Sequence, residues 1–196
     1  RAREAAAWWV ALGWKERRLR LLNIKGALTR NLNRMAEQIH QETGKPLQDA
    51  QLETIMAITH LDWAARNARK VLGPRTVFPG VASINQKAIL EYHPLGVVGV
   101  IGPWNYPIFT PMGSIAYALA AGNAVVFKPS EFTPGVGVLL AELIEGVVPE
   151  QPVFQVITGL GETGAALASS PDVDKIAFTG SAPTAKKVMA ACAQNL

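Results

Sequence analysis

The sequence predicts an α/β fold, in which a parallel sheet with flanking helices follows an N-terminal helical segment. Up to about residue 72, apolar residues recur at helical spacing, and from Val97 onward short apolar runs alternate with longer amphipathic ones. Such alternation is typical of a parallel sheet with helices on both faces. With 196 residues, 49% of them hydrophobic and 17% charged, the chain can bury a core of this kind.

The helical periodicity of the first 72 residues has clear boundaries. Apolar residues repeat at helical spacing at Leu21, Ile24 and Leu28 and again at Leu52, Met56 and Trp63. Gly44-Lys45-Pro46 separates two helices, because glycine ends a helix and proline fits the first turn of the next. Residues 73–80 hold two glycines and two prolines and are expected to form a connector, and residues 88–93 are strand-like.

From Val97 onward a strand–loop–helix rhythm repeats. The expected strands are Val97–Ile101, Ala124–Phe127, Val153–Ile157 and Lys175–Phe178, and the expected helices lie near residues 108–121, 135–146, 161–169 and 182–193. Sheets of this kind bind ligands at the carboxyl ends of their strands, which is where the most distinctive residues of this chain lie.

Charge and composition narrow the classes of function. Basic residues outnumber acidic ones by 13 to 7 in residues 1–70, whereas residues 71–196 hold 6 against 8. The basic residues are spread around amphipathic helices without a recognition motif, so we expect solvated helix faces and no nucleic-acid partner. No apolar run reaches the roughly 18–20 residues of a membrane span, so no membrane partner is expected. One cysteine, Cys192, excludes an internal disulfide and suits a cytoplasmic location, and the three histidines show no metal-ligand spacing.

Two strand ends suggest nucleotide binding. Gly159–Gly164 forms a Gly-x-Gly-x-x-Gly pattern, but the next strand end, Phe178–Ser181, lacks the acid that a dinucleotide fingerprint needs. An acid instead follows the strand Ala124–Phe127, in Lys128-Pro129-Ser130-Glu131, where a carboxylate and an ammonium could share one ribose. Glu131 would also repel a 2′-phosphate and therefore favours NAD over NADP. A plain tight turn and an ordinary ion-paired turn remain open alternatives for these two segments.

Two further strand ends suit anionic groups. Ser181 is a good N-cap and Pro183 fits a first helical turn, so the helix they begin would offer free N–H groups to a pyrophosphate. The strand Val97–Ile101 leads into Gly102-Pro103-Trp104-Asn105-Tyr106-Pro107, whose prolines stiffen the loop that carries Asn105. A fixed amide at this edge suits an oxyanion hole, although each loop also has a purely structural interpretation as a well-made turn.

Together these loops resemble the aldehyde dehydrogenase superfamily. The resemblance rests on Pro103-Trp104-Asn105, Lys128 to Glu131, Phe178 to Ser181 and, upstream, Glu42-Thr43-Gly44-Lys45-Pro46. It implies an aldehyde dehydrogenase-like fold with a Rossmann-type sheet. Residues 1–80 would be a helical segment packing on the sheet, residues 81–96 a strand arm towards an oligomerisation domain, and residues 97–196 the NAD-binding domain. A homo-oligomer, either a dimer or a tetramer, is implied for the full-length protein.

The resemblance also implies a function, the NAD-dependent oxidation of an aldehyde to a carboxylic acid through a thiohemiacetal and a thioester, with NADP as an alternative cofactor. Asn105 would be catalytic, as the amide donor to the oxyanion. Lys128 and Glu131 would hold the adenosine ribose, the Gly180-Ser181 turn would face the pyrophosphate, and Gly161 and Gly164 would let the backbone approach the adenine side. The implied cofactor-binding residues are Ile101, Gly102, Pro103, Trp104, Asn105, Lys128, Ser130, Glu131, Gly161, Gly164, Phe178, Thr179, Gly180, Ser181 and Ala185.

The sequence departs from the family pattern in two ways. Many members have glycine where Ala185 stands, so we expect an altered cofactor fit. The family's nucleophilic cysteine and general base lie downstream of Phe-Thr-Gly-Ser, beyond the end of this sequence, and Cys192 is expected to make apolar contacts only. We therefore expect this polypeptide alone to be inactive. The alternatives are a non-catalytic NAD-binding or assembly module and a relative of acyl-phosphate or acyl-CoA reductases.

Overall fold

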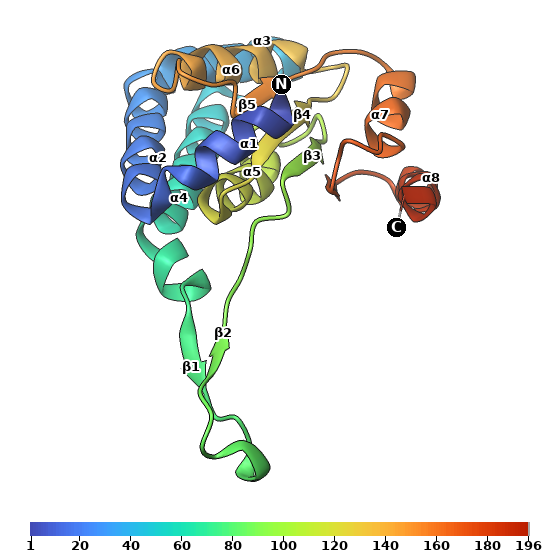
Figure 1. Cartoon of the computed structure of the whole chain (residues 1–196). Helices are drawn as coiled ribbons and strands as arrows, with labels where there is room; N and C mark the ends of the chain where they lie inside the picture. The colour runs from blue at the N-terminus through green and yellow to red at the C-terminus, as the bar shows by residue number, and fades with distance from the viewer. Residues whose placement is uncertain (196) are drawn as a thin grey trace.

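Four helices occupy the first 72 residues, as the sequence spacing predicts (Figure 1). The structure is a computed structural model that describes residues 1–195. The helices are α1 (Ala2–Ala11), α2 (Gly13–Arg30), α3 (Leu32–Thr43) and α4 (Leu47–Leu72). Gly44 ends α3 in a left-handed conformation with φ +70°, and Pro46 directly precedes α4. The boundary expected at residues 44–46 is therefore confirmed.

The buried faces of α2 and α4 differ in the size of their side chains. On α2, Leu21, Ile24 and Leu28 are buried, as expected from their spacing. On α4 the large apolar residues lie elsewhere, since Leu52 is 57% and Trp63 51% exposed. The buried side of α4 consists mostly of small residues that allow α5 to pack closely: Ala50, Glu53, Thr54, Ala57, Leu61, Ala64 and Ala65. The pattern of large residues therefore predicted this helix but not its buried face.

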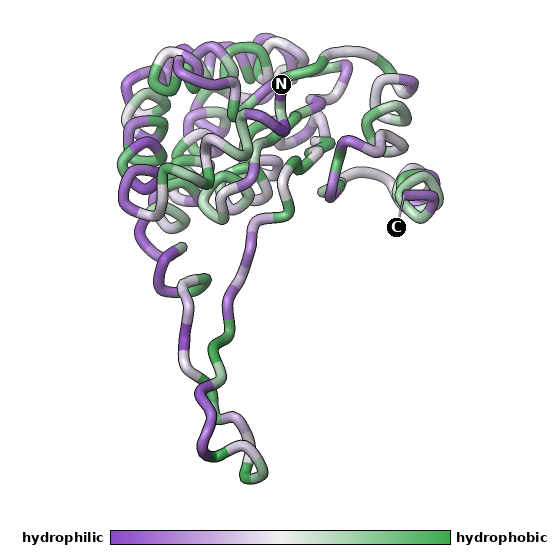
Figure 2. The backbone as a smooth tube through the Cα atoms, viewed as in Figure 1, coloured by the Kyte–Doolittle hydropathy of each residue, from purple (hydrophilic) through white to green (hydrophobic). Residues whose placement is uncertain are grey.

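A two-stranded arm extends away from the rest of the molecule (Figure 1). β1 (Arg75–Val77) pairs antiparallel with β2 (Ala88–Leu90), and the 3-10 helix η1 (Val81–Ser83) lies between them. The connector expected at residues 73–80 thus contains a strand, which was not predicted because glycine and proline flank it on both sides. The strand expected at residues 88–93 is present but ends at Leu90. Figure 2 shows apolar segments on the arm, and five large apolar residues of this part of the chain are exposed: Val77, Phe78, Val81, Ile84 and Ile89.

The main sheet has four parallel strands in the order β5-β4-β3-β6. The strands are β3 (Val97–Ile101), β4 (Ala124–Lys128), β5 (Phe154–Val156) and β6 (Lys175–Phe178). The helices are α5 (Phe109–Ala121), α6 (Pro134–Glu145), α7 (Gly161–Ala168) and α8 (Ala182–Cys192), followed by the 3-10 helix η2 (Ala193–Asn195). Each predicted element from Val97 onward is present, with its ends shifted by at most one residue. The α/β class with a parallel sheet and flanking helices is confirmed.

Helices cover both faces of this sheet. The side chain of Phe127 on β4 faces Gly137 of α6 and lies near Pro111 of α5, so α5 and α6 share one face. The helices α2 to α4 pack behind these two. Gly99 on β3 faces α7 on the other side, where an added Cβ would lie 3.3 Å from the Leu167 side chain and 2.5 Å from that of Ile176. A side chain at position 99 would therefore require the Ile176 and Leu167 side chains to shift, so glycine here allows α7 to approach the sheet closely.

The two sides of the sheet are buried to different degrees. The largest fully buried side chains lie in the helices α1 to α5, at the N-cap of α5 (Ile108) and on β4 (Phe127). Those in the helices are Trp9, Leu21, Ile24, Leu28, Met35, Ile39, Leu61, Met112, Ile115 and Leu119. Within residues 1–195, α7 buries only Leu167 and Ala168, and α8 has no buried residue. In the same part of the chain, we find no helix that is both long and apolar enough to cross a membrane.

Candidate nucleotide and oxyanion site

The carboxyl ends of three strands lie in one row. Ile101 at the end of β3 is in register with Lys128 of β4 on one side and with Phe178 of β6 on the other. The loops that follow these strands therefore emerge at the same edge of the sheet. Together with the first turns of α7 and α8 they surround a cavity of about 980 Å³.

This cavity brings together residues that lie far apart in the sequence. Fourteen of the fifteen cofactor-binding residues predicted from the sequence line it: Ile101, Gly102, Pro103, Trp104, Asn105, Lys128, Ser130, Glu131, Gly161, Gly164, Phe178, Thr179, Gly180 and Ser181. The fifteenth, Ala185, is not among the lining residues. The cavity face of α8 is formed by Ser181, Thr184, Lys187, Val188 and Ala191. Ala185 lies about a quarter turn around the helix from Thr184, so its methyl group points away from that face.

Lys128 and Glu131 form the charged part of the cavity wall. Lys128 is 4% exposed, and its Nζ donates to the Pro129 carbonyl at 3.1 Å and lies 3.7 Å from Glu131 Oε2. The Glu131 side chain is 42% exposed, and its carboxylate accepts a hydrogen bond from the Ser130 hydroxyl at 3.4 Å. A buried ammonium beside an accessible carboxylate can donate to and accept from neighbouring hydroxyls of one ligand.

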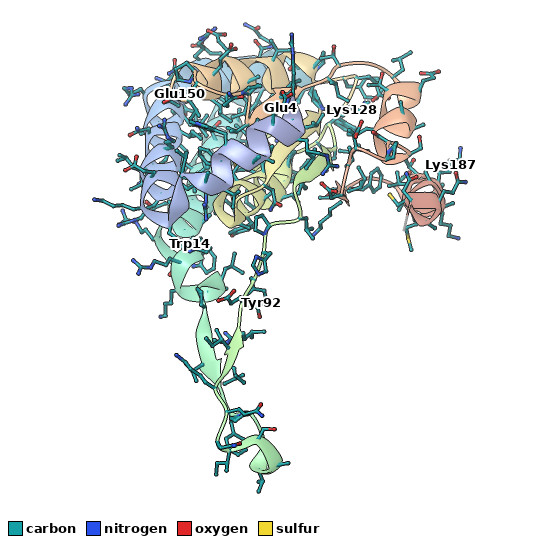
Figure 3. The ribbon with its side chains drawn as sticks, in the orientation of Figure 1. Glu4, Trp14, Tyr92, Lys128, Glu150 and Lys187 are labelled. Atoms are coloured by element: carbon teal, nitrogen blue, oxygen red, sulfur yellow. The ribbon has the colours of Figure 1, made fainter. Side chains whose placement is uncertain are left out.

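The helix α8 directs its N-terminus at the cavity. Its N-cap is Ser181, whose hydroxyl accepts from the Thr184 N–H at 3.4 Å and lies 3.0 Å from the Thr184 hydroxyl. Lys187 lies on the cavity face of the same helix, and Figure 3 shows it across from Lys128. The positive end of the helix dipole and a lysine together favour an anionic group.

The Gly-x-Gly-x-x-Gly pattern forms a tight turn into α7 and also lines the cavity. Gly159 has φ +148°, and a Cβ there would collide with the Thr163 side chain, so glycine is required. At Gly161, where α7 begins, an added Cβ would meet nothing within 4 Å, which leaves open space beside the backbone. Both of the interpretations that the sequence left open for this segment are thus compatible with its geometry.

Asn105 lies in an exposed part of the loop between β3 and α5. Its side-chain amide makes no hydrogen bond within residues 1–195, but its backbone carbonyl accepts from Lys45 Nζ at 2.9 Å. Lys45 also forms an ion pair with Glu53, which is 1% exposed. Glu53 Oε1 in turn accepts the N–H groups of Ile108 at 3.0 Å and Phe109 at 3.3 Å, where α5 begins.

Lys45 and Glu53 lie outside the cavity, and their link to the Asn105 loop was not predicted from the sequence. A signal was available, because Glu53 falls at helical spacing between Ala50 and Ala57 and so places a carboxylate on an otherwise apolar face. A buried carboxylate needs partners, and these come from α5 and from the segment before α4. The partner N–H of Ile108 lies 55 residues away in the sequence, which is why periodicity alone could not identify it.

Aromatic side chains continue from the Asn105 loop across α5 and α4. The ring of Tyr106 lies 6.3 Å from that of Phe109, which stacks on His60 at 5.2 Å. Tyr117 contacts both His60 and Trp63 edge-on, at 5.6 Å each. Burial lowers the pKa of His60, so its ring is neutral at pH 7.

Cys192 does not belong to the cavity. It lies at the end of α8, is half-buried, and its Sγ is 3.6 Å from the Ala168 carbonyl oxygen on α7. It is absent from the residues that line the cavity around Asn105. The sequence predicts only apolar contacts for Cys192, whereas in the structure its thiol also has a carbonyl oxygen as hydrogen-bond partner.

A comparison with known proteins decides the family. The model of the aldehyde dehydrogenase family matches residues 1–196. The chain belongs to this family. An aldehyde dehydrogenase of Deinococcus radiodurans is 40% identical over 100% of this chain and 37% of its own length, and a glutarate-semialdehyde dehydrogenase of Pseudomonas aeruginosa is 36% identical over 96% and 38%.

Crystal structures of aldehyde dehydrogenases share the fold described above. Lactaldehyde dehydrogenase from Escherichia coli superimposes with a TM-score of 0.92 at 32% identity, over 99% of this chain and 40% of that one. An NADP-dependent enzyme from the same organism gives a TM-score of 0.91 at 34% identity, over 99% and 40%. The aldehyde dehydrogenase chain described here thus spans less than two fifths of the length of the curated relatives it matches.

Proposed function

We propose that this chain supplies the NAD site and the oxyanion donor of an enzyme that oxidises an aldehyde to a carboxylic acid. The observation that carries the proposal is that Asn105, Glu131 and Ser181, from three separate strand ends, line one cavity. If each loop were only a turn, there would be no reason for all three to line the same cavity, whereas a shared ligand site explains it.

The residues present fit a dinucleotide. The cavity volume lies in the range of small-molecule and cofactor sites. Lys128 and Glu131 provide a donor and an acceptor for a ribose, the Ser181-capped helix and Lys187 suit a pyrophosphate, and the open space at Gly161 admits a close ligand. When bound, NAD supplies the hydride acceptor of the reaction.

In the proposed reaction, the Asn105 side-chain amide stabilises the negative charge that develops on the aldehyde oxygen. An amide held on a stiff loop needs little reorganisation when that charge forms. The aromatic row from Tyr106 to Trp63 begins next to Asn105, and Trp104 and Tyr106 are 54% and 46% exposed. This exposure supports an apolar entrance for the aldehyde over the alternative of core packing.

The position of Glu131 supports NAD over NADP as the cofactor. A 2′-phosphate on the adenosine ribose would bring two negative charges towards this carboxylate. Replacing Glu131 with Gln is expected to strengthen NADP binding to the chain while NAD binding weakens, as measured by isothermal titration calorimetry. Tighter binding of NADP than of NAD by the unaltered chain would reverse this assignment.

The cofactor site is tested by calorimetric titration of the chain with NAD. We expect binding that Lys128→Met weakens about tenfold or more, because a charged donor to the ribose is lost. The matched control is Lys175→Met, which removes a lysine from the exposed start of β6. Failure of the unaltered chain to bind NAD would contradict the proposal and favour an assembly module.

We also propose that residues 1–196 alone bind the cofactor without turning over an aldehyde, because Cys192 lies outside the cavity. Turnover of an aldehyde by this polypeptide with NAD would contradict this proposal. Reduction of an acyl phosphate or acyl-CoA in the presence of NADH would instead identify a reductase.

For assembly, we propose the three-part division given by the resemblance, with residues 97–196 binding NAD and residues 1–80 packing on that domain except for β1, which joins residues 81–96 in the arm that holds subunits together in the cytoplasm. Exposed apolar residues on the arm support self-association. Multi-angle light scattering should show a dimer or tetramer of the protein that carries the arm, and Val81→Glu should lower its mass to that of a monomer. An unchanged mass in this variant would contradict the role of the arm.

A further inference from the structure

We propose that Lys45 and Glu53 form a clamp that positions Asn105. The two residues lie outside the cavity, and neither belongs to the predicted site. They join three segments, namely the corner before α4, the helix α4 itself, and the loop that carries Asn105. The inference rests on the proposed function only for the chemical role of Asn105, and the geometry of the clamp is independent of it.

The first arm of the clamp acts on the backbone of the loop. Lys45 Nζ donates to the Asn105 carbonyl at 2.9 Å and lies 4.2 Å from the centre of the Tyr106 ring. The ammonium therefore holds two consecutive residues at once, through a charge-assisted hydrogen bond and a cation–π contact. The side chain of Lys45 is 16% exposed, so water competes only weakly for these bonds.

The second arm fixes the end of the loop. Glu53 Oε1 accepts the N–H groups of Ile108 and Phe109, whereas Glu53 Oε2 pairs with Lys45. One carboxylate thus caps the N-terminus of α5 and neutralises the ammonium that holds Asn105. Because Pro107 stiffens the short span between these anchors, little freedom remains for the backbone at Asn105, from which its side chain extends.

A clamp makes a prediction that a merely stabilising ion pair does not. Loss of the Lys45 charge should alter the environment of Asn105 specifically, while the fold and the remaining loops stay as they are. Lys25 provides the matched control, since it also forms an ion pair with α4, at 2.7 Å from Asp62, but lies away from the loop. Lys45→Arg provides the conservative rescue, because it keeps the charge and the donors.

The test is nuclear magnetic resonance of the full chain labelled with ¹³C and ¹⁵N, with the Asn105 side-chain signals identified by Asn105→Asp. In Lys45→Met, we expect the Asn105 carbonyl carbon and side-chain NH₂ signals to shift towards values of a flexible chain. Signals of the loop at 129–133 should stay unchanged. Lys25→Met should leave Asn105 unmoved, and Lys45→Arg should restore most of the shift.

Unmoved Asn105 signals in Lys45→Met, or an equal shift in Lys25→Met, would overturn the proposal. If Lys45→Met does not fold, Glu53→Gln is the second variant, since it keeps an acceptor for α5 but removes the charge that anchors Lys45. Unchanged Asn105 signals in Glu53→Gln would then overturn the clamp. NAD titration of the unaltered chain separates the two proposals. If the unaltered chain does not bind NAD while the Asn105 signals move in Lys45→Met, the cofactor assignment is lost and the clamp stands.

Discussion

The two sides of the cavity are built differently. One, which we term the braced side, comprises the loops after β3 and β4 with α5 and α6. Its helices pack against α2, α3 and α4, and buried side chains such as Phe127 and Ile108 lie beneath it. The other, termed the open side, comprises α7, β6 and α8, where α8 has no buried residue within residues 1–195.

The helix N-termini show the same difference. On the braced side, carboxylates from the helical segment cap both helices, with Glu53 at α5 and Glu42 at α6, where its oxygens accept the N–H groups of Gly135 at 2.7 Å and Val136 at 2.9 Å. On the open side, the N-terminus of α8 is capped by its own Ser181, and within residues 1–195 no other side chain caps it. The residues proposed for ribose and oxyanion thus sit on a well-packed frame, and those proposed for pyrophosphate on a weakly packed one.

The largest expected effect is in local stability. Amides in the middle of α5 should exchange with solvent only on global unfolding, whereas those of α8 should exchange through local opening, with a difference of several kcal/mol in opening free energy. Hydrogen exchange followed by mass spectrometry measures this directly. Addition of NAD should slow exchange in the first turn of α8 more than in α5. Equal protection of α5 and α8 from hydrogen exchange in the absence of NAD would contradict the difference between the two sides of the cavity.

Two phenylalanines at neighbouring strand ends sharpen the comparison. Phe127 is 1% exposed, so Phe127→Ala should lower the free energy of unfolding by about 3–5 kcal/mol. Phe178 is only half-buried, and Phe178→Ala should cost clearly less. Urea denaturation gives both values. Similar losses for the two variants would show that β6 is as well packed as β4.

Removal of the caps tests the frame itself. Glu42→Ala takes away the partner of two N–H groups and should lower the free energy of unfolding by about 1–2 kcal/mol. Ser181→Ala removes a longer, exposed bond and should have a smaller effect on unfolding, below about 1 kcal/mol. Denaturation curves of the two variants rank them. A larger loss for Ser181→Ala would place the rigid side at α8.

The smallest expected effect concerns the dependence of stability on pH at His60. Burial lowers the pKa of His60 in the folded chain, so the unfolded chain takes up its proton first as the pH falls. The stability that the neutral ring contributes is therefore present above about pH 6.5 and is lost as the pH falls through the folded pKa. His60→Gln should flatten the change in urea midpoint between about pH 7.5 and pH 5.5. An unaltered profile would contradict this.

The sequence predicted the elements that carry strong local signals. Residues such as Asn105, Glu131 and Ser181 stand at strand ends with proline, glycine or a cap beside them, and the register of three parallel strands brought them together. Ala185 was placed in the site by resemblance, but the turn angle of α8 directs it away. Local chemistry thus located loops that line one cavity, and helix geometry decided which residues of α8 face it.

What the sequence did not predict depends on contacts between distant segments. Lys45 lay within a segment singled out for its helix boundary, yet its partners Glu53 and Asn105 are defined only once α4 packs on α5. The buried side of α4 could not be predicted for a similar reason. Small residues such as Ala57 are buried because α5 packs closely against them, and not because they are strongly hydrophobic.

The short segment from Glu42 to Glu53 has a consequence for how the site responds to change. Glu42 at one end holds the helix behind the Lys128–Glu131 loop, and Glu53 at the other holds the helix behind Asn105. Displacement of the whole segment would reach both loops together, whereas loss of the Lys45 side chain alone acts only on the loop that carries Asn105. We therefore expect only substitutions that shift the backbone of this segment to alter the two loops in parallel.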